Sequence, residues 1–313
     1  MSSASYIAGR LAQMIPTLIL VVVLVFFLVH LLPGDPAVAL MGERATPDAI
    51  ERMRRVMGLD RPLPTQFVIY VRHLAAGDFG NSLLLRIPVS SLILQRLPVT
   101  LMLVAMSSLL AILIAVPLAL IAALRQGGSV DLTLRSVFQV WLSMPVFYLG
   151  LVLLIVFAAR LRWFPVGGFG QNLPDDLYHM VLPAFTLAFS FAAILMRNLR
   201  ASLIEVLNAE YVTFATAKGL RRRLVLLRHV MRNAAISTVT LFGLNIGSAV
   251  GGAVITETVF GIPGVGRLMV DSIFGRDYQV VQGLTFTIAV FVSLIFLAVD
   301  LVQAWLDPRI AHG

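Results

Sequence analysis

The sequence of 313 residues contains no cysteine and few charged side chains. Without cysteine, disulfide bonds, thiolate metal sites and cysteine nucleophiles are excluded. Charged residues make up 13% of the chain and hydrophobic residues 59%, whereas about 25% of a typical soluble domain is charged. This composition excludes an ordinary soluble enzyme and indicates a protein that lies in a membrane.

Six long segments contain no aspartate, glutamate, lysine or arginine. Because a helix rises about 1.5 Å per residue, about 20 apolar residues cross the hydrocarbon core of a bilayer. The sequence therefore predicts an all-α membrane protein with six transmembrane helices. The first segment exceeds the apolar core of a signal peptide and no A-x-A site follows it, so we expect a retained anchor. The segments are 11–34, 97–124, 136–159, 177–196, 234–256 and 278–299.

The basic residues predict the orientation of these spans. The chain carries 24 Lys+Arg against 16 Asp+Glu, and the basic residues divide evenly between the two sides of the membrane. On the side opposite the N-terminus, however, most of them lie in residues 35–96, and long loops cross a membrane largely regardless of their charge. Without that segment the excess lies on the N-terminal side, which predicts that both termini are cytoplasmic. The net charge of +8 then reflects topology, and we expect no nucleic-acid partner.

The long segment after the first span has its own helix signals. Thr46-Pro47 is typical of an N-cap followed by proline in the first turn, and Gly58 can end that helix. A second amphipathic helix is predicted over 66–74. Such a segment either packs on the bundle or offers a docking surface to an external partner. The apolar sides of the two helices comprise Ile50, Met53 and Met57, and Phe67, Tyr70, Val71 and Leu74.

The loop over 197–233 predicts two short helices that meet at Gly219. Glycine tolerates the left-handed backbone that a tight turn between helices requires. Ala215 and Ala217 are small and would allow another backbone to approach closely, and Lys218, the chain's one lysine, precedes an arginine run at 221–223. Contacts with anionic lipid headgroups would explain the basic residues. They would not explain the alanines and the glycine.

The segment Glu210-Tyr211-Val212-x-x-Ala215-x-Ala217-Lys218-Gly219 resembles the coupling-loop motif of ABC importer permeases. It is closest to the form found in the dipeptide/oligopeptide/nickel/glutathione group. Against the broader Glu-Ala-Ala motif, aligned on Gly219, only Ala215 and Gly219 match strictly. Eight further segments resemble the same group. They are Pro33-Gly34-Asp35-Pro36, Met57-Gly58-Leu59-Asp60-x-Pro62, Gly77-Asp78-Phe79-Gly80, Arg232-Asn233-Ala234, Glu257-Thr258-Val259-Phe260, Pro263-Gly264-Val265-Gly266, Arg276-Asp277-Tyr278 and Asp307-Pro308-Arg309.

The resemblance implies a type I ABC importer permease fold in a bacterial inner membrane. It implies a second homologous permease as heterodimer partner, two cytoplasmic ATPase subunits and a periplasmic solute-binding protein. The implied substrates are peptides or a related solute such as glutathione or a nickel complex. A cytoplasmic coupling-helix hairpin would lie between spans four and five. The residues expected to couple to the ATPases are Glu210, Tyr211, Ala215, Ala217, Lys218 and Gly219.

These expectations divide the chain into three parts. Residues 1–32 form the N-terminus and first span, 33–96 the external helical segment, and 97–313 the permease core. The core contains the coupling loop 197–233. Its spans are expected at about 97–124, 136–159, 177–196, 234–256 and 279–303.

The chain itself is not expected to be an enzyme. It contains no G-x-x-x-x-G-K-[ST] segment, so ATP and magnesium would be used by the partner ATPases, and this chain would bind no cofactor or metal. Its five histidines show no metal-ligand spacing. The alternative is a self-sufficient secondary transporter or channel. It would require inverted repeats and charges in the middle of spans, and we find neither.

The fifth and sixth spans hold the candidates for a pathway or gate. Gly243, Gly247 and Gly251 recur every four residues, with Asn245 beside them. Such a ridge either packs helices closely within the bundle or forms a face between subunits. Among ionisable residues, Glu257 and Asp300 lie near the ends of these spans. Charges in a membrane are costly and often functional, so a gating role stands beside simple solvation at the interface.

Overall fold

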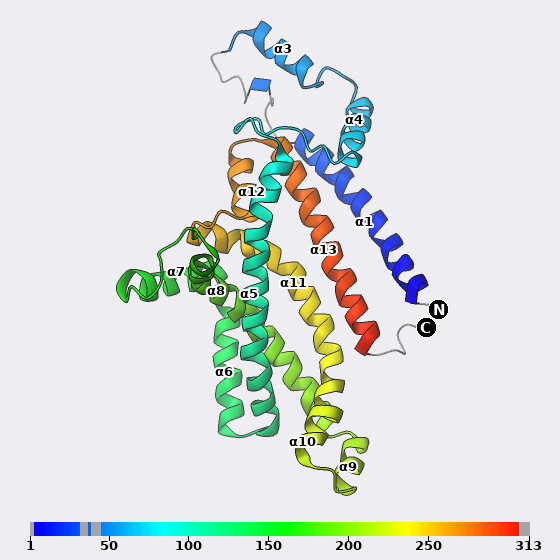
Figure 1. The fold of residues 1–313 in the computed structure, drawn as a ribbon, viewed down its shortest axis with the longest axis vertical. Coiled ribbons are helices and arrows are strands. Elements are labelled where there is room, and N and C mark those ends of the chain that lie inside the picture. Colours follow the sequence, from blue (N-terminus) through cyan, green and yellow to red (C-terminus); the bar gives the residue numbers. More distant parts are fainter. Residues whose placement is uncertain (1–2, 32–36, 39–44, 307–313) are drawn as a thin grey trace.

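The computed structural model describes residues 3–31, 37–38 and 45–306. Within this part of the chain every named element is a helix. The motifs at 33–36 and 307–309 lie outside the described residues. Figure 1 shows an elongated bundle whose two ends differ. Helices α3 (Pro47–Val56) and α4 (Leu63–Ala75) lie at what we call the cap end, and α9 (Glu210–Ala217) and α10 (Arg222–Leu224) lie at the hairpin end.

Among the described residues, five continuous helices are long and apolar enough to cross a membrane. Most of them extend beyond the charge-free stretches that predicted them, because charged side chains near a helix end reach the membrane interface without ending the helix. The five are α1 (Ser3–Leu31), α5 (Val89–Leu124), α8 (Leu173–Leu207), α11 (Arg232–Phe260) and α13 (Tyr278–Leu306).

The remaining span is a bent pair rather than the single helix expected over 136–159. Its axis turns by 102°. The break falls at Met144, whose backbone is extended (φ −83°, ψ 132°) directly before Pro145. Proline disfavours the α conformation in the residue before it, so the helix ends there and a new one starts in another direction. The parts are α6 (Ser129–Ser143), α7 (Val146–Leu153) and the π-helical continuation η1 (Leu154–Arg160).

The helices alternate in direction along the bundle. Helix α1 runs toward the cap end, α5 returns, α6 runs back, α7 turns aside from the bundle, α8 descends to the hairpin, α11 rises and α13 descends (Figure 1). The first turns of α1 and the last turns of α13 are therefore neighbours. Arg10 Nε and Asp300 Oδ2 lie 3.3 Å apart and join them.

The core lies between α5 and α8. Lipid tails are as apolar as leucine, so helices in a membrane associate through close packing of small residues rather than through the hydrophobic effect. Each helix presents a fully buried ridge of alanines at spacings of three or four residues. The ridges are Ala111, Ala115, Ala119 and Ala122 on α5, and Ala184, Ala188 and Ala192 on α8.

The cap confirms the two helices predicted between the first span and α5. Proline occupies the first turn of α3, and Gly58 follows its C-cap with φ +68°. Helix α4 packs on the end of α1, where the ring centroids of Phe26 and Phe67 lie 5.2 Å apart and those of Phe26 and Tyr70 lie 5.9 Å apart. Burial at this contact raises the pKa of Tyr70 to about 12. The cap is thus attached through the aromatic contacts of α4 with α1.

A buried ion pair joins the start of α6 to α8. Arg200 donates from Nε to Asp131 Oδ1 and from Nη2 to Asp131 Oδ2, both at 2.6 Å. The carboxylate also accepts the backbone N–H of Gly127 at 3.0 Å. Asp131 is 1% exposed. If Arg200 were removed, the Asp131 carboxylate would be left as a buried charge without a cation to balance it.

We expect Arg200→Gln to destabilise the chain by ~3 kcal/mol, because it leaves the Asp131 carboxylate buried without its cation. Thermal unfolding in detergent measures the loss. The matched control is Arg55→Gln, which breaks an exposed Arg55–Glu51 pair at 3.9 Å and should change nothing measurable. Equal shifts for the two variants would contradict this assignment of the buried pair.

Candidate functional site

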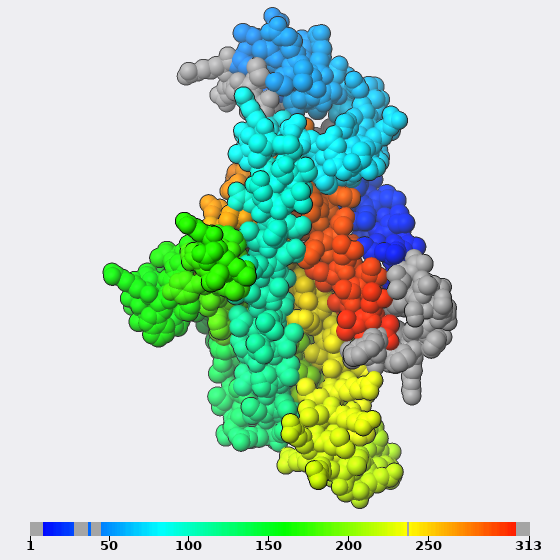
Figure 2. Space-filling view, in the orientation of Figure 1, coloured from blue at the N-terminus to red at the C-terminus, as the bar shows by residue number. Residues whose placement is uncertain are grey.

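The hairpin between α8 and α11 projects from one end of the bundle, where Figures 1 and 2 show it extending beyond the other helices. After Leu207 the chain forms α9, turns, and continues through α10 into the π-helical segment η2 (Val225–Met231) and then α11. The predicted pair of short helices is therefore present, with the turn centred on Gly219.

Hydrogen bonds lock this turn. The Gly219 N–H donates to Thr216 O at 2.9 Å, and the Leu220 N–H donates to Ala215 O at 3.4 Å. This pair of bonds defines the Schellman motif, in which the residue after the C-cap takes the left-handed conformation. Gly219 has φ +78°, and a Cβ there would meet no atom within 4 Å. Glycine is thus required by the backbone angle and not by space.

The inner side of α9 packs on the chain's own core. Val212 and Ala215 are buried, together with Val225 and Val230 of η2. Their burial holds α9 against the end of the bundle, so the short helix is carried by the spans on either side of it.

A hydrogen-bond chain ties α9 to the start of α11. Asn233 donates from Nδ2 to the Tyr211 hydroxyl oxygen at 3.1 Å and to His229 O at 2.7 Å. A displacement of α9 would therefore pull on the first turn of α11. This places Tyr211, one of the predicted coupling residues, in a connecting position.

The outer side of the hairpin is apolar at several positions. Phe214 is 66% exposed and Tyr211 44% exposed. Exposed apolar side chains that form a contiguous patch mark interaction sites, whereas single ones do not. The two alanines differ: Ala215 faces the core, and Ala217 lies on the surface with Lys218 and Glu210. Further exposed apolar residues at this end are Leu220, Leu224 and Leu227.

The three glycines of the predicted ridge on α11 do not have the same neighbours. A Cβ on Gly243 would overlap Val299, and one on Gly247 would lie 3.0 Å from Phe296, so both glycines bring α11 close to α13. Gly251 faces open space. Asn245 donates within its own helix, to Leu241 O at 2.6 Å.

Glu257 is fully buried and caps α12 (Val265–Phe274), a helix that no sequence pattern predicted. Its Oε2 accepts the backbone N–H of Arg267 at 3.0 Å, and its Oε1 accepts the Thr100 hydroxyl at 2.6 Å. A carboxylate at a helix N-terminus satisfies free N–H groups and complements the helix dipole. A Cβ on Gly264 would overlap the Glu257 carboxylate. The carboxylate therefore joins α5, α11 and α12.

Asp300 is the second predicted gating residue and is paired with Arg10 across α1 and α13. A groove of about 460 Å³ runs along this contact. The structure thus separates the two acidic candidates: Glu257 lies in a closed cradle between α5, α11 and α12, and Asp300 lies in a partly exposed ion pair between α1 and α13.

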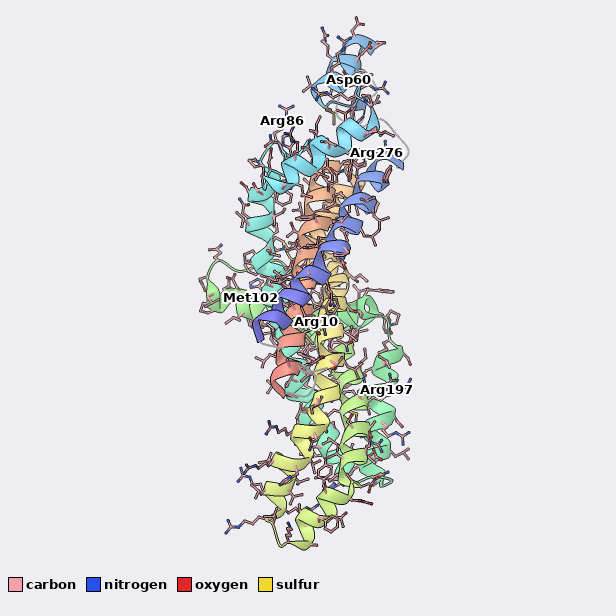
Figure 3. The ribbon with its side chains drawn as sticks, turned by 90° about the vertical axis from the view of Figure 1, so that its right-hand side faces the viewer. Arg10, Asp60, Arg86, Met102, Arg197 and Arg276 are labelled. Carbon is pink, nitrogen blue, oxygen red and sulfur yellow. The ribbon has the colours of Figure 1, made fainter. Side chains whose placement is uncertain are left out.

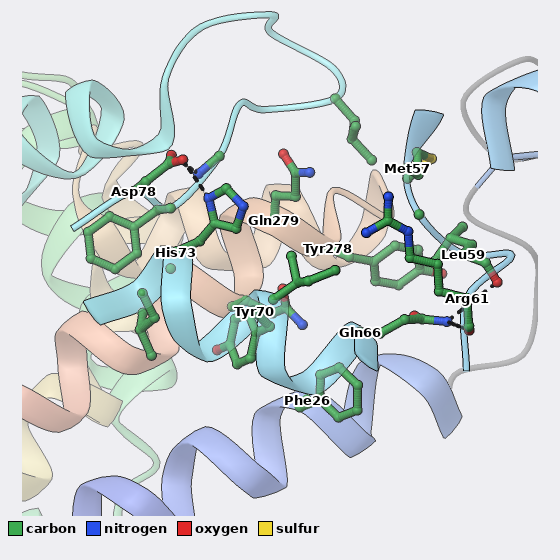
Figure 4. A pocket seen from close by; sticks show the side chains of 18 of the residues that line it. Phe26, Met57, Leu59, Arg61, Gln66, Tyr70, His73, Asp78, Tyr278 and Gln279 are labelled. Atoms are coloured by element: carbon green, nitrogen blue, oxygen red, sulfur yellow. Dashed lines mark hydrogen bonds and ion pairs between the residues drawn. The ribbon is translucent and has the colours of Figure 1, made fainter. Parts of the chain in front are cut away.

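A second polar region lies at the cap end, in a pocket of about 470 Å³ between α4 and the start of α13 (Figure 4). His73 Nδ1 and Asp78 Oδ2 lie 2.8 Å apart. The Gly80 N–H donates to Asp78 Oδ1 at 2.9 Å, and these two hydrogen bonds hold the pKa of Asp78 below its usual value. Gln279 of α13 also lines this pocket.

Several structural residues escaped the sequence analysis because their partners are distant in the chain. Ser82 donates to Asp277 Oδ2 at 2.5 Å across 195 positions, and Thr100 lies 157 positions from Glu257. The alanine ridges of α5 and α8, by contrast, carry a readable four-residue period. In the described part of the chain, no group of three or more histidine and carboxylate side chains could hold a metal ion.

The sequence matches known membrane transport proteins over nearly its whole length. Residues 115–312 match the family described as the binding-protein-dependent transport system inner membrane component, and residues 4–104 match the N-terminal component of the same membrane proteins. A probable peptide ABC transporter permease, y4tP of Sinorhizobium fredii, is 37% identical over 98% of this chain and 99% of its own length. The glutathione transport permease GsiC of Pectobacterium atrosepticum is 39% identical over the same shares.

The fold itself also matches a solved structure. The inward-facing methionine ABC transporter MetNI gives a TM-score of 0.59 at 15% identity, covering 69% of this chain and 96% of that chain. Two family matches that together cover most of the chain, and relatives matched over nearly their full length, establish the family. The chain belongs to the binding-protein-dependent transport system inner membrane components and is the multi-pass permease subunit of an ABC importer.

Proposed function

We propose that this permease imports peptides or a related small solute such as glutathione, and that its hairpin transmits ATP-driven closure from cytoplasmic ATPases to the spans. The permease names of its relatives, peptide and glutathione, support the substrate class. The observation that carries the coupling role is the hairpin itself: a short helix locked by a Schellman turn, packed inward on the core, with aromatic side chains outward.

The coupling assignment follows the two sides of α9. Ala215 packs inward and would fix the helix to the bundle, and Tyr211 would pass its movement to α11 through Asn233. Glu210, Ala217 and Lys218 lie on the exposed side, where a small residue between two charged ones would allow a partner groove to approach closely. Gly219 would hold the turn rigid, so that displacement reaches the spans instead of being absorbed locally.

The candidate pathway and gating residues would have different roles, because their neighbours in the structure differ. Gly243, Asn245 and Gly247 would serve the packing of α11 within this chain, whereas Gly251, with open space before it, would face the pathway or the second permease. Glu257 would hold α5, α11 and α12 together, because each of its two carboxylate oxygens already accepts a hydrogen bond from a neighbouring element. Asp300 is the better gating candidate, since its ion pair with Arg10 is partly exposed and can separate.

The complex would contain this chain, a second homologous permease, two ATPases that use ATP and magnesium, and a periplasmic solute-binding protein. The hairpin would face the cytoplasm. Because the helices alternate in direction, the first turn of α1 and the last turn of α13 belong to the hairpin side. Both termini would therefore be cytoplasmic, and the cap of α3 and α4 would face the periplasm, where exposed α3 can meet the binding protein.

We expect Gly219→Val to uncouple transport while leaving membrane insertion and abundance near normal. A β-branched residue at positive φ costs on the order of 1–3 kcal/mol of backbone strain, and a Cβ at this position meets no atom within 4 Å. Solute-stimulated ATP hydrolysis and uptake in reconstituted vesicles, normalised to assembled complex, should fall together. Ala217→Trp should have the same effect through bulk.

Two variants serve as controls for this experiment. Gly219→Asn should retain most coupling, because asparagine tolerates the left-handed conformation. Arg222→Gln removes one exposed charge and should cost little. Normal coupling in Gly219→Val, or an equal loss in Arg222→Gln, would mean that the segment is only a basic membrane anchor.

The orientation is testable because the natural chain lacks cysteine. Cysteines at Ala45 and Ala76 of the cap should react with an impermeant thiol reagent added to intact spheroplasts. A cysteine at Ser129, at the start of α6, should react only after lysis. The reverse pattern would overturn the proposed topology.

A further inference from the structure

A groove of about 380 Å³ opens between α6 and α8 near the hairpin end, and all its lining residues come from these two helices. The character of its lining changes along its length. Arg135, Arg197 and Arg200 lie at the hairpin end of the groove, with Leu132, Ser136 and Ala201 beside them, and the part farther from that end is mostly apolar, with Gln139 as its polar residue. Arg197 lies on the flank of the bundle, labelled in Figure 3.

The Asp131–Arg200 bridge fixes how the two helices face each other. Arg135 follows Asp131 by four residues on α6, and Arg197 precedes Arg200 by three residues on α8. The helices run in opposite directions, so Arg135 and Arg197 both lie about one turn, roughly 5 Å, farther from the hairpin end than the bridge. Arg135 and Arg197 thus line the groove at the same level, one on each wall.

The charges of the groove are unbalanced. Asp131 binds Arg200 with both oxygens. Among the described residues no carboxylate forms an ion pair with Arg135 or Arg197, and both side chains are exposed. Guanidinium groups present forked N–H donors that match the oxygens of a phosphate group. The level of these arginines, within about two turns of the start of α6, corresponds to the headgroup layer if α5 and α6 turn at the membrane surface.

The apolar part of the groove extends from the arginines toward the middle of the spans. Its floor is formed by the buried side chains of Phe138, Ala193 and Met196, and the partly exposed Leu142 lines it on α6. A soluble phosphate compound would have no use for this part. A molecule with a phosphate at one end and a hydrocarbon chain at the other would fill both parts.

We propose that the groove between α6 and α8 binds one anionic phospholipid. Its phosphate contacts Arg135 and Arg197, and one acyl chain lies along Phe138 and Met196. The lipid bridges the two helices above the Asp131–Arg200 pair and holds the bent span against the core. Phosphatidylglycerol is the probe for this site, and zwitterionic phosphatidylethanolamine is the comparison.

The test uses the complete importer, purified through a tag on this chain, with bound lipid measured by native mass spectrometry during titration. The importer should bind phosphatidylglycerol in preference to phosphatidylethanolamine. The double variant Arg135→Gln/Arg197→Gln should weaken the affinity for phosphatidylglycerol roughly 30-fold. The control Arg125→Gln, an exposed arginine at the end of α5 outside the groove, should leave it within about twofold.

Three results would overturn the proposal. The first is equal binding of the two lipids by the unmodified importer, a comparison that does not depend on any variant. The second is unchanged phosphatidylglycerol binding in the double variant. The third is photo-cross-linking from Gln139, which lines the groove, to another protein subunit instead of to lipid, because the groove would then be a protein interface.

Discussion

The close packing of α5 against α8 is the interaction on which the rest of this structure depends. Apolar side chains gain nothing by leaving lipid for one another, so two membrane helices stay together where small residues bring their backbones close. The alanine ridges centred on Ala115 and Ala188 provide that contact. Helix α8 leads directly into the hairpin, and α5 ends where the bent span begins, so this packed pair connects the proposed ATPase contact to most of the bundle.

The hairpin and the Glu257 cradle stand at opposite ends of α11. At the hairpin end, Asn233 links the first turn of α11 to Tyr211 of α9. At the cap end, the Glu257 carboxylate binds Thr100 of α5 and the N-terminus of α12. A rigid helix held at both ends transmits displacement, which is what coupling between separate sites requires. The ion pair of Arg10 with Asp300 lies outside this path, on the outer pair of helices α1 and α13.

Sequence patterns predicted the parts of this protein that depend on local chemistry. Charge-free stretches located five continuous spans, Thr46-Pro47 and Gly58 located α3, and Gly219 located the hairpin turn. The bend before Pro145 was not predicted, because proline inside a span can either kink or break a helix and neighbours decide which. Helix α12 was missed because its N-terminus is completed by Glu257 and Thr100 instead of by a local cap. The same holds for Asp131 with Arg200: pairs of distant residues leave no local signal.

The most direct test of the account is where the hairpin lies in the assembled importer. A photo-reactive amino acid at Phe214, which is 66% exposed, should cross-link to an ATPase subunit, and the yield should change when ATP binds. The same probe at Phe274, which is 84% exposed at the end of α12, should give no ATPase product. An ATPase cross-link from Phe274, or only lipid products from Phe214, would contradict the assignment of the hairpin as the coupling element.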